Sequence, residues 1–281
     1  MKPAAFDYYR PTTLEETLEL LAEHGDEGKI IAGGQSFVPI LNMRMSTPEC
    51  LIDINHLPDL DYIRVEDGFL KIGALTRQRE LETSELVRNH VPLLAEAVPF
   101  IGHTQTRNRG TVGGSLAHAD PSAELPLCFL ALDAKMKIHG TDGERQADIE
   151  DFFITYLTTE LMPDELLTDI LIPIGEKKGY AFEEFSRRHG DFAIVAAACL
   201  LKTDSQGNIL SGNLTLGGID AIPVKAEEAI DALVGKPLTE ESLEEACQLS
   251  TEDADPDDDL HASREYRIHL AKVVANRAIK K

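Results

Sequence analysis

The sequence predicts an α+β protein, and three observations carry this prediction. The first is a strand–helix–strand pattern over residues 6–32, and the second is a pair of hairpin signals around Asp67-Gly68 and Thr141-Asp142-Gly143. The third is helical spacing of apolar residues from Pro223 onward. The 281 residues suffice for two domains. We expect an N-terminal domain over 1–175, with lobes of about 1–56 and 57–175, and a C-terminal α+β domain over 176–281.

The elements of the N-terminal half follow from caps and breakers. A strand over 6–10 stops at Pro11, and Thr13 with Glu16 forms a capping-box pattern for a helix that Gly25 closes. Thr76 and Ser84 are the expected caps of later helices. In order, we expect strands over 29–32 and 50–54, a hairpin over 62–66 and 69–73, and two or three helical pieces over 76–100.

The elements of the C-terminal half follow in the same way. An apolar helix starts at Asp120-Pro121-Ser122 and runs to Ala131. An acidic loop over 252–259 lacks the glycine and final glutamate of a calcium loop, which favours a solvated linker. We further expect strands over 135–139, 145–148, 166–173, 179–187, 194–203 and 209–216, and helices over 224–234, 240–250 and 263–279.

Composition excludes several functional classes. Acidic residues outnumber basic ones by 49 to 27, and the net charge of −22 opposes general binding to nucleic acid or to an anionic membrane. No stretch has the length of a membrane span or the pattern of a signal peptide, so a cytoplasmic protein without membrane insertion is expected. The four cysteines are scattered, which indicates core residues and no zinc or iron–sulfur site of this chain.

Two glycine pairs stand out, in Ala32-Gly33-Gly34-Gln35-Ser36 and in Thr111-Val112-Gly113-Gly114-Ser115. Glycine permits positive φ and close backbone approach, and successive N–H groups in such turns can bind an anion, with hydroxyls as further donors. Either pair alone could be an ordinary tight turn. Together they indicate one long ligand whose diphosphate is held from two sides.

Other chemistry is weakly supported. The sequence contains no G-x-G-x-x-G, no Walker loop and no nucleophile elbow around Ser115. His118 and Asp120 could bind a metal, but they more readily shape a binding loop or cap the next helix. The cluster Arg187-Arg188-His189 is either a contact site or an exposed strand end. Because no acid–base or nucleophile set is present, we expect no catalytic side chain and a cofactor that carries the chemistry.

Three ordered segments carry a family resemblance: 32–39 (AGGQSFVP), 50–54 (CLIDI) and 107–121 (RNRGTVGGSLAHADP). With Ser186-Arg-Arg-His-Gly-Asp-Phe-Ala-Ile-Val195 and Leu216-Gly-Gly-Ile219, they resemble the FAD-binding medium subunit of molybdenum hydroxylases, such as xanthine dehydrogenase and aerobic carbon monoxide dehydrogenase. The resemblance covers nearly the whole chain. It implies a two-lobed flavin domain of the vanillyl-alcohol-oxidase type, followed by a smaller domain with an antiparallel sheet and helices.

The resemblance also implies which residues bind FAD. Residues 30–37 would wrap the diphosphate, Thr111 to Ser115 would hold it from the other side, and further positions would line the flavin or adenosine. Where xanthine dehydrogenase relatives carry a lysine near the isoalloxazine, this chain has Glu183. With Asp120 of the binding loop, the expected cofactor-binding residues are Ile30, Ile31, Ala32, Gly33, Gly34, Gln35, Ser36, Phe37, Ile101, Thr111, Gly113, Gly114, Ser115, Asp120, Glu124 and Leu167.

The implied function is electron transfer within a complex. By resemblance, FAD in this chain would take electrons from the [2Fe–2S] clusters of a small subunit, while a large molybdopterin subunit hydroxylates the substrate, and a terminal acceptor would receive the electrons. The implied assembly is a dimer of heterotrimers. The alternatives are a self-sufficient flavin oxidase or reductase of the same fold, and a binding protein that has lost the cofactor.

Overall fold

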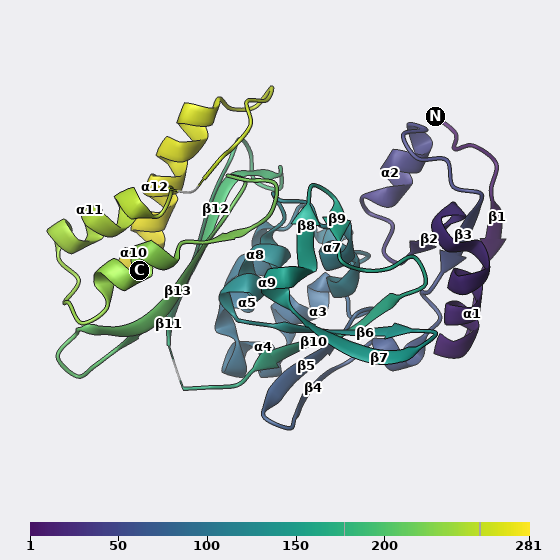
Figure 1. Ribbon diagram of the computed structural model, residues 1–281, viewed down its shortest axis with the longest axis horizontal. Coiled ribbons are helices and arrows are strands. Elements are labelled where there is room, and N and C mark those ends of the chain that lie inside the picture. The colour runs from purple at the N-terminus through teal and green to yellow at the C-terminus, as the bar shows by residue number, and fades with distance from the viewer. Residues whose placement is uncertain (177, 253) are drawn as a thin grey trace.

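The computed structural model describes residues 1–176, 178–252 and 254–281. Within these residues the strands form a three-stranded, a five-stranded and a four-stranded sheet and a small two-stranded ribbon. The three sheets follow one another along the long axis of the molecule, with the N-terminal strands at one end and the C-terminal helices at the other (Figure 1). The α+β prediction is confirmed.

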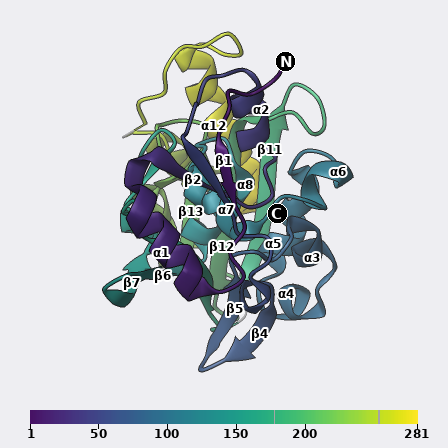
Figure 2. The same ribbon diagram turned by 90° about the vertical axis from the view of Figure 1, so that its right-hand side faces the viewer.

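The three-stranded sheet is parallel and small. Its strands are β1 (Asp7–Tyr9), β3 (Cys50–Asp53) and β2 (Gly28–Ile31), in that order, and the helices of this unit are α1 (Leu14–His24) and α2 (Phe37–Asn42), with the 3₁₀ turn η1 (Gly25–Glu27). This unit faces the viewer in Figure 2. Thr13 caps α1 by accepting from the Glu16 amide at 3.2 Å, and the Glu16 carboxylate accepts from the Thr12 amide. The cap therefore closes one residue earlier than an ideal capping box.

The five-stranded sheet is antiparallel. Its order is β4 (Ile63–Glu66), β5 (Phe69–Gly73), β10 (Leu166–Pro173), β6 (Lys135–Gly140) and β7 (Gly143–Asp148), and the ribbon is β8 (Phe153–Thr155) with β9 (Thr158–Thr159). Around it lie η2 (Pro58–Leu60), α3 (Gln78–Thr83), α4 (Glu85–His90), α5 (Pro92–Ala97), η3 (Val98–Phe100), α6 (Thr104–Arg107), α7 (Val112–His118), α8 (Glu124–Ala131) and α9 (Ile149–Phe152). Ser84 caps α4 as predicted. The prediction for Thr76 was wrong, because its hydroxyl donates to the Tyr62 carbonyl and α3 begins only at Gln78.

The four-stranded sheet is antiparallel and carries the C-terminal helices. Its strands are β11 (Gly179–Ser186), β12 (Ala193–Thr203), β13 (Ile209–Gly217) and β14 (Val224–Lys225), and the helices are α10 (Glu227–Leu233), α11 (Glu240–Leu249) and α12 (Arg264–Lys280). The prediction of helix from residue 224 was wrong for its first residues. Val224 and Lys225 pair instead with Leu216 and Thr215 at the sheet edge, and this pairing delays the helix.

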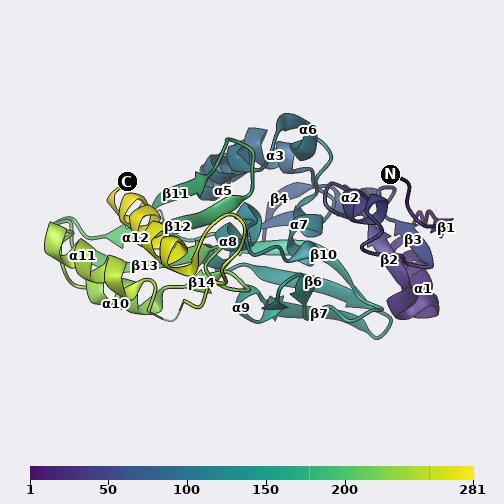
Figure 3. The same ribbon diagram turned by 90° about the horizontal axis from the view of Figure 1, so that it is seen from above.

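Strand β12 joins two hydrophobic cores. Ala196 and Ala198 pack into the core that also contains Leu70 and Ile172 of the five-stranded sheet, whereas Ala197 packs with the C-terminal helices. This alternation follows from the two-residue period of a strand. Helices α5 and α8 accordingly cover one face of the sheet and α12 the other (Figure 3). Apolar packing thus continues across residue 175, where we expected a domain boundary.

Candidate functional site

A cavity of about 720 Å³ lies where the two glycine turns meet. This volume is within the range typical of small-molecule and cofactor sites. Every residue that the sequence predicts to bind cofactor lines it, namely Ile30, Ile31, Ala32, Gly33, Gly34, Gln35, Ser36, Phe37, Ile101, Thr111, Gly113, Gly114, Ser115, Asp120, Glu124 and Leu167. The fold therefore gathers segments that lie far apart in the sequence, and direct contact of each residue with a cofactor stays a prediction.

The first turn joins β2 to α2. Gly34 adopts a positive φ of +69°, and the Gln35 side-chain amide donates to the Gly33 carbonyl at 2.9 Å. A Cβ atom at Gly33 would lie 2.4 Å from the Arg109 carbonyl oxygen. Only glycine fits there, because the backbone of the second segment occupies the position of a side chain.

The second turn joins the loop after α6 to α7. The Thr111 hydroxyl accepts from the Gly114 amide at 3.2 Å, and the Gly113 amide donates to the Ala74 carbonyl at 2.8 Å. A Cβ atom at Gly113 would lie 2.5 Å from the Ala74 Cβ atom. Thr111 and Gly113 are buried, and Gly114 is exposed toward the cavity. The Thr111 side chain thus caps α7, and Gly114 lines the cavity next to this cap, with a Cβ position 2.5 Å from the Thr111 hydroxyl.

Basic side chains contribute little to the cavity wall. Lys29 is exposed, and His118 is the other basic residue among those that line the cavity. The acidic residues are Asp120, Glu124, Glu165 and Asp191, of which Glu165 is ion-paired with Arg145 at 2.7 Å. A phosphate group in this cavity would therefore depend on backbone amides and hydroxyls for its stabilisation.

Glu124 supplies a buried carboxyl to the lining of the cavity. It is 7% exposed. Burial raises its pKa to about 8, and the nearby Glu184 carboxylate contributes to this shift. Burial likewise raises the pKa of Glu184 to about 7, and one of its carboxyl oxygens has no hydrogen-bond partner among the described residues. At neutral pH, Glu124 therefore presents a protonated, uncharged carboxyl to the cavity.

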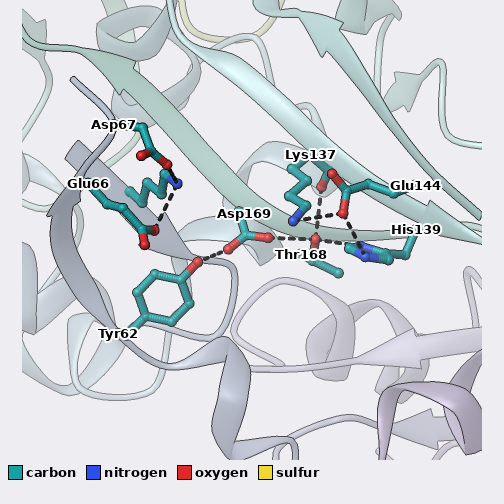
Figure 4. Close-up of polar contacts among 9 residues, drawn as sticks. Tyr62, Glu66, Asp67, Lys137, His139, Glu144, Thr168 and Asp169 are labelled. Atoms are coloured by element: carbon teal, nitrogen blue, oxygen red, sulfur yellow. Dashed lines mark hydrogen bonds and ion pairs between the residues drawn. The ribbon is translucent and has the colours of Figure 1, made fainter. Parts of the chain in front are cut away.

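The second turn also connects to a polar network in the five-stranded sheet. The Ala74 amide donates to the Thr168 carbonyl at 2.8 Å, and the Thr168 hydroxyl donates to Asp169 at 2.8 Å. Figure 4 shows Asp169 between Tyr62 and Thr168, with His139 on the far side of Thr168. Burial raises the pKa of Asp169 to about 6.

Several predicted candidates lie elsewhere or act differently. Arg187, Arg188 and His189 form an exposed turn after β11, in agreement with the strand-end interpretation. The structure does not place Glu183 against the cavity: its carboxylate lies 3.6 Å from Lys281 and it is absent from the lining, because strand alternation points Glu184 toward Glu124 instead.

His118 and Asp120 form no metal site in the described part of the chain. Both line the cavity, and Asp120 accepts from the Ser122 amide at 2.9 Å, as a loop-shaping residue would. The described residues contain no group of three or more potential metal ligands. The acidic loop 252–259 includes residue 253, which lies outside the described residues.

Sequence reasoning missed part of the wall. Gln78 is 6% exposed, lines the cavity, and its side-chain oxygen has no hydrogen-bond partner among the described residues. No sequence signal distinguished it from a core position of α3. Gly110, Asp191 and Phe192 also line the cavity, and they lie inside segments that carry the family resemblance.

The residues present fit a dinucleotide such as FAD. Gly33 and Gly113 bring bare backbone to the cavity wall. A side chain at Gly33 would collide with the backbone of the second segment, and one at Gly113 would collide with Ala74. The unpartnered Gln78 oxygen is a buried acceptor that a ligand hydroxyl or N–H group would satisfy.

Comparisons with known proteins agree with this geometry. Residues 4–175 match the family model described as the FAD binding domain in molybdopterin dehydrogenase, and residues 180–281 match the CO dehydrogenase flavoprotein C-terminal domain. Subunit alpha of the 6-hydroxypseudooxynicotine dehydrogenase complex of Paenarthrobacter nicotinovorans is 41% identical, over 100% of this chain and 95% of that protein. No helix of the described residues is long and apolar enough to cross a membrane.

Solved structures show the same arrangement. Carbon monoxide dehydrogenase from Hydrogenophaga pseudoflava aligns with a TM-score of 0.97 and 34% identity, covering 100% of this chain and 98% of that chain. Quinoline 2-oxidoreductase from Pseudomonas putida 86 aligns with a TM-score of 0.95 and 37% identity, covering 100% and 97%. The chain belongs to the family of FAD-binding medium subunits of molybdenum-containing dehydrogenases.

Proposed function

We propose that this chain is the electron-transfer subunit of a multi-subunit molybdenum hydroxylase. Its FAD takes electrons from [2Fe–2S] clusters of a small partner subunit and passes them to a terminal acceptor, while a molybdopterin subunit hydroxylates the substrate. The observation that carries this proposal is the single cavity lined by both glycine turns. Bound FAD supplies the redox chemistry, because it can accept electrons singly and release them in pairs.

The roles of this chain's residues follow from the cavity wall. The backbone N–H groups of the first turn, with the hydroxyls of Ser36 and Thr111, would hold the diphosphate. In the second turn the Gly113 and Gly114 amides already donate to the Ala74 carbonyl and the Thr111 hydroxyl, so this turn would contribute its hydroxyls and its bare backbone surface. Glu124 would present its protonated carboxyl as a hydrogen-bond donor. These roles require no nucleophile or base for a substrate.

Substrate selection is assigned to another chain. Relatives that match nearly the full length are named for different compounds: the 41% identical protein for 6-hydroxypseudooxynicotine, and a 40% identical protein from Pseudomonas sp. strain CBB1 for caffeine. The medium chain of Hydrogenophaga pseudoflava, 33% identical, is named for carbon monoxide. Because similar flavin subunits belong to proteins named for such different compounds, we place the substrate site outside this chain.

The assembly that we propose for the complex is a dimer of heterotrimers.

The test is a reconstituted complex with and without the flavin. We expect the complex purified from its native host to contain this chain, FAD and two further subunits. Removal of FAD should leave reduction of the clusters by substrate intact and abolish reduction of the acceptor. Steady turnover of the isolated chain with a small electron donor would instead favour a self-sufficient flavin oxidase or reductase, and full-length protein that gains no flavin absorption with added FAD would overturn both.

The diphosphate site is tested by a charge introduced at Gly114. This residue is exposed toward the cavity, so Gly114→Asp would place a carboxylate against the diphosphate. Any Cβ here would also lie 2.5 Å from the Thr111 hydroxyl and displace that cap, so a control of equal size is needed. We expect loss of most bound FAD. Gly114→Asn is the matched control, because it has the same size without the charge and should retain more flavin. Wild-type flavin content in Gly114→Asp would mean that the second turn does not face the phosphates.

A further inference from the structure

A polar bridge connects the two glycine turns, and its centre is Arg77, the residue before α3. One guanidinium nitrogen of Arg77 donates to the Arg109 carbonyl at 2.6 Å, and another donates to the Asn55 side-chain oxygen at 2.8 Å. Both acceptors are uncharged. We call these three groups the Arg77 bridge.

On one side the bridge holds the first turn. The Asn55 side-chain nitrogen donates to the Ala32 carbonyl at 2.7 Å and to the Asp53 carboxylate at 2.6 Å. Tyr8 donates to the same Asp53 carboxylate. Asn55 therefore links Arg77 to the first residue of the turn and to the end of β3.

On the other side the bridge holds the second turn. Arg109 directly precedes Gly110-Thr111, and its carbonyl is the atom that a Cβ at Gly33 would approach to 2.4 Å. The oxygen that accepts from Arg77 is thus also the point at which the two turns touch. Arg77 bonds to this oxygen directly and is linked to the first turn through Asn55.

The Arg77 backbone is paired with the second turn. Arg77 forms an isolated antiparallel bridge with Thr111, and the next residue, Gln78, donates its amide to the Gly110 carbonyl at 2.9 Å. Among the described residues, the three-stranded unit has no such backbone pairing to this turn. Within that same part of the chain, its core includes Leu60, Leu75 and Leu166 from the buried residues of the five-stranded unit. Figure 3 shows this unit at the end of the molecule, beyond α7.

Arg77 does not line the cavity, although its neighbours Leu75 and Gln78 do. A phosphate in the cavity would therefore contact the backbone of the turns. The Arg77 guanidinium would not contact the phosphate itself and would act by holding that backbone in place. We propose that Arg77 is a positioning residue, whose rigid pair of N–H donors sets the spacing between the two glycine turns and so preorganises the cofactor site. This inference rests on the proposed role of both turns in holding FAD.

The shape of the Arg77 donor group, and not its charge, fixes the spacing between the two turns. A guanidinium presents donors in a planar fork that can reach two acceptors on different segments, whereas an ammonium is a compact point charge. Arg77→Lys keeps the charge and loses the fork. We therefore expect Arg77→Lys and Arg77→Ala to behave alike.

The experiment measures FAD affinity of the full-length chain, with FAD removed and added back, by the quenching of flavin fluorescence. We expect Arg77→Lys, Arg77→Ala and Asn55→Ala each to weaken FAD binding by about tenfold or more, because open arrangements of the turns then compete with the binding-competent one. The double variant Arg77→Ala with Asn55→Ala should be no weaker than the worse single variant, because both remove one bridge.

Arg79→Ala is the matched control. It lies two residues further along the chain and pairs with Glu82, which keeps its ion pair with Arg107 when Arg79 is removed. We expect less than about a twofold change in FAD affinity. Circular dichroism of each FAD-free variant reports whether the fold is kept, and Arg77→Lys is decisive if Arg77→Ala does not fold.

Two outcomes would overturn the inference. Wild-type affinity in Arg77→Lys with loss in Arg77→Ala would show that the charge acts, and the salt dependence of FAD binding would then fall only in Arg77→Ala. Wild-type affinity in both variants would show that the bridge does not set the site. A wild-type chain that binds no FAD would instead refute the proposed function, so the two failures are distinguishable.

Discussion

The two glycine turns share a sequence pattern but are held in different ways. The second turn is part of the main core: Gly113 is buried, bonded to Ala74, and continuous with β10 through Thr168. The first turn belongs to a small parallel sheet, and the Arg109 carbonyl of the other unit lies where a Cβ of Gly33 would be. We infer that the second turn is fixed by the fold as a whole, whereas the first depends on a few contacts between units. Substitutions in the second turn should therefore lower the stability of the fold, whereas substitutions in the first turn should mainly weaken cofactor binding.

The largest effect is expected at Gly113. Gly113→Val would place its Cβ 2.5 Å from the Ala74 Cβ and 2.9 Å from the Ala74 backbone, and a buried sheet cannot shift to relieve both contacts. We expect a loss of about 3 kcal/mol in the free energy of unfolding, together with loss of FAD. Denaturant unfolding measures the first quantity. Gly175→Ala, which meets nothing within 4 Å, is the control and should change stability by less than about 0.5 kcal/mol.

Gly33→Ala should affect FAD binding more than it affects the stability of the fold. Its Cβ would lie 2.4 Å from the Arg109 carbonyl, but the three-stranded unit can move away as a body. We expect FAD affinity to fall by about tenfold or more, with a change in unfolding free energy of about 1 kcal/mol. Flavin titration and denaturant unfolding of the same samples give both numbers. A stability loss as large as that of Gly113→Val would contradict the idea that the first turn is held independently.

Two aspartates, one near each turn, should give opposite pH dependences. Burial raises the pKa of Asp169 to about 6, so its ionisation costs stability as pH rises from about 4 through 6, and that cost persists above pH 6. For Asp53, burial is outweighed by hydrogen bonds from Tyr8 and Asn55, which hold its pKa below the ordinary value. Its contribution is therefore present at neutral pH and is lost only in stronger acid.

The variant Asp169→Asn tests the first half of this contrast. Asparagine can still accept from Tyr62 and cannot ionise. We expect the free energy of unfolding of this variant to exceed that of wild type by about 2 kcal/mol at pH 7.5. This difference should disappear near pH 4, as measured by unfolding at several pH values. An advantage that does not depend on pH would show that Asp169 is not the titrating group.

The smallest effects are expected at the hydroxyl residues. Thr111 caps α7, so Thr111→Val should cost about 1 kcal/mol of stability. Ser36 makes no capping bond to α2, and Ser36→Ala should change stability by less than about 0.5 kcal/mol. Both should weaken FAD binding modestly if their hydroxyls donate to the diphosphate. Thermal unfolding with and without FAD separates the two contributions, and equal stability costs would mean that Thr111 contributes no cap.

Local chemistry made most of the elements predictable. Thr13, Ser84, Asp67-Gly68 and Gly143 act over a few residues, and the two helices and two hairpins they mark are present. The errors occurred where a distant partner decides. Thr76 bonds to Tyr62, and Val224 pairs with Leu216, and in neither case does the neighbouring sequence reveal the partner.

The sequence by itself determined the α+β class, the two glycine turns and the family pattern that joins them, because propensities, caps and glycine conformations act locally. Only the tertiary structure decided what the turns contact. It placed the Arg109 carbonyl against Gly33, the buried Gln78 amide at the cavity and Arg77 between both segments. These contacts depend on how the three sheets pack against one another, and this packing cannot be predicted from the spacing of residues along the chain.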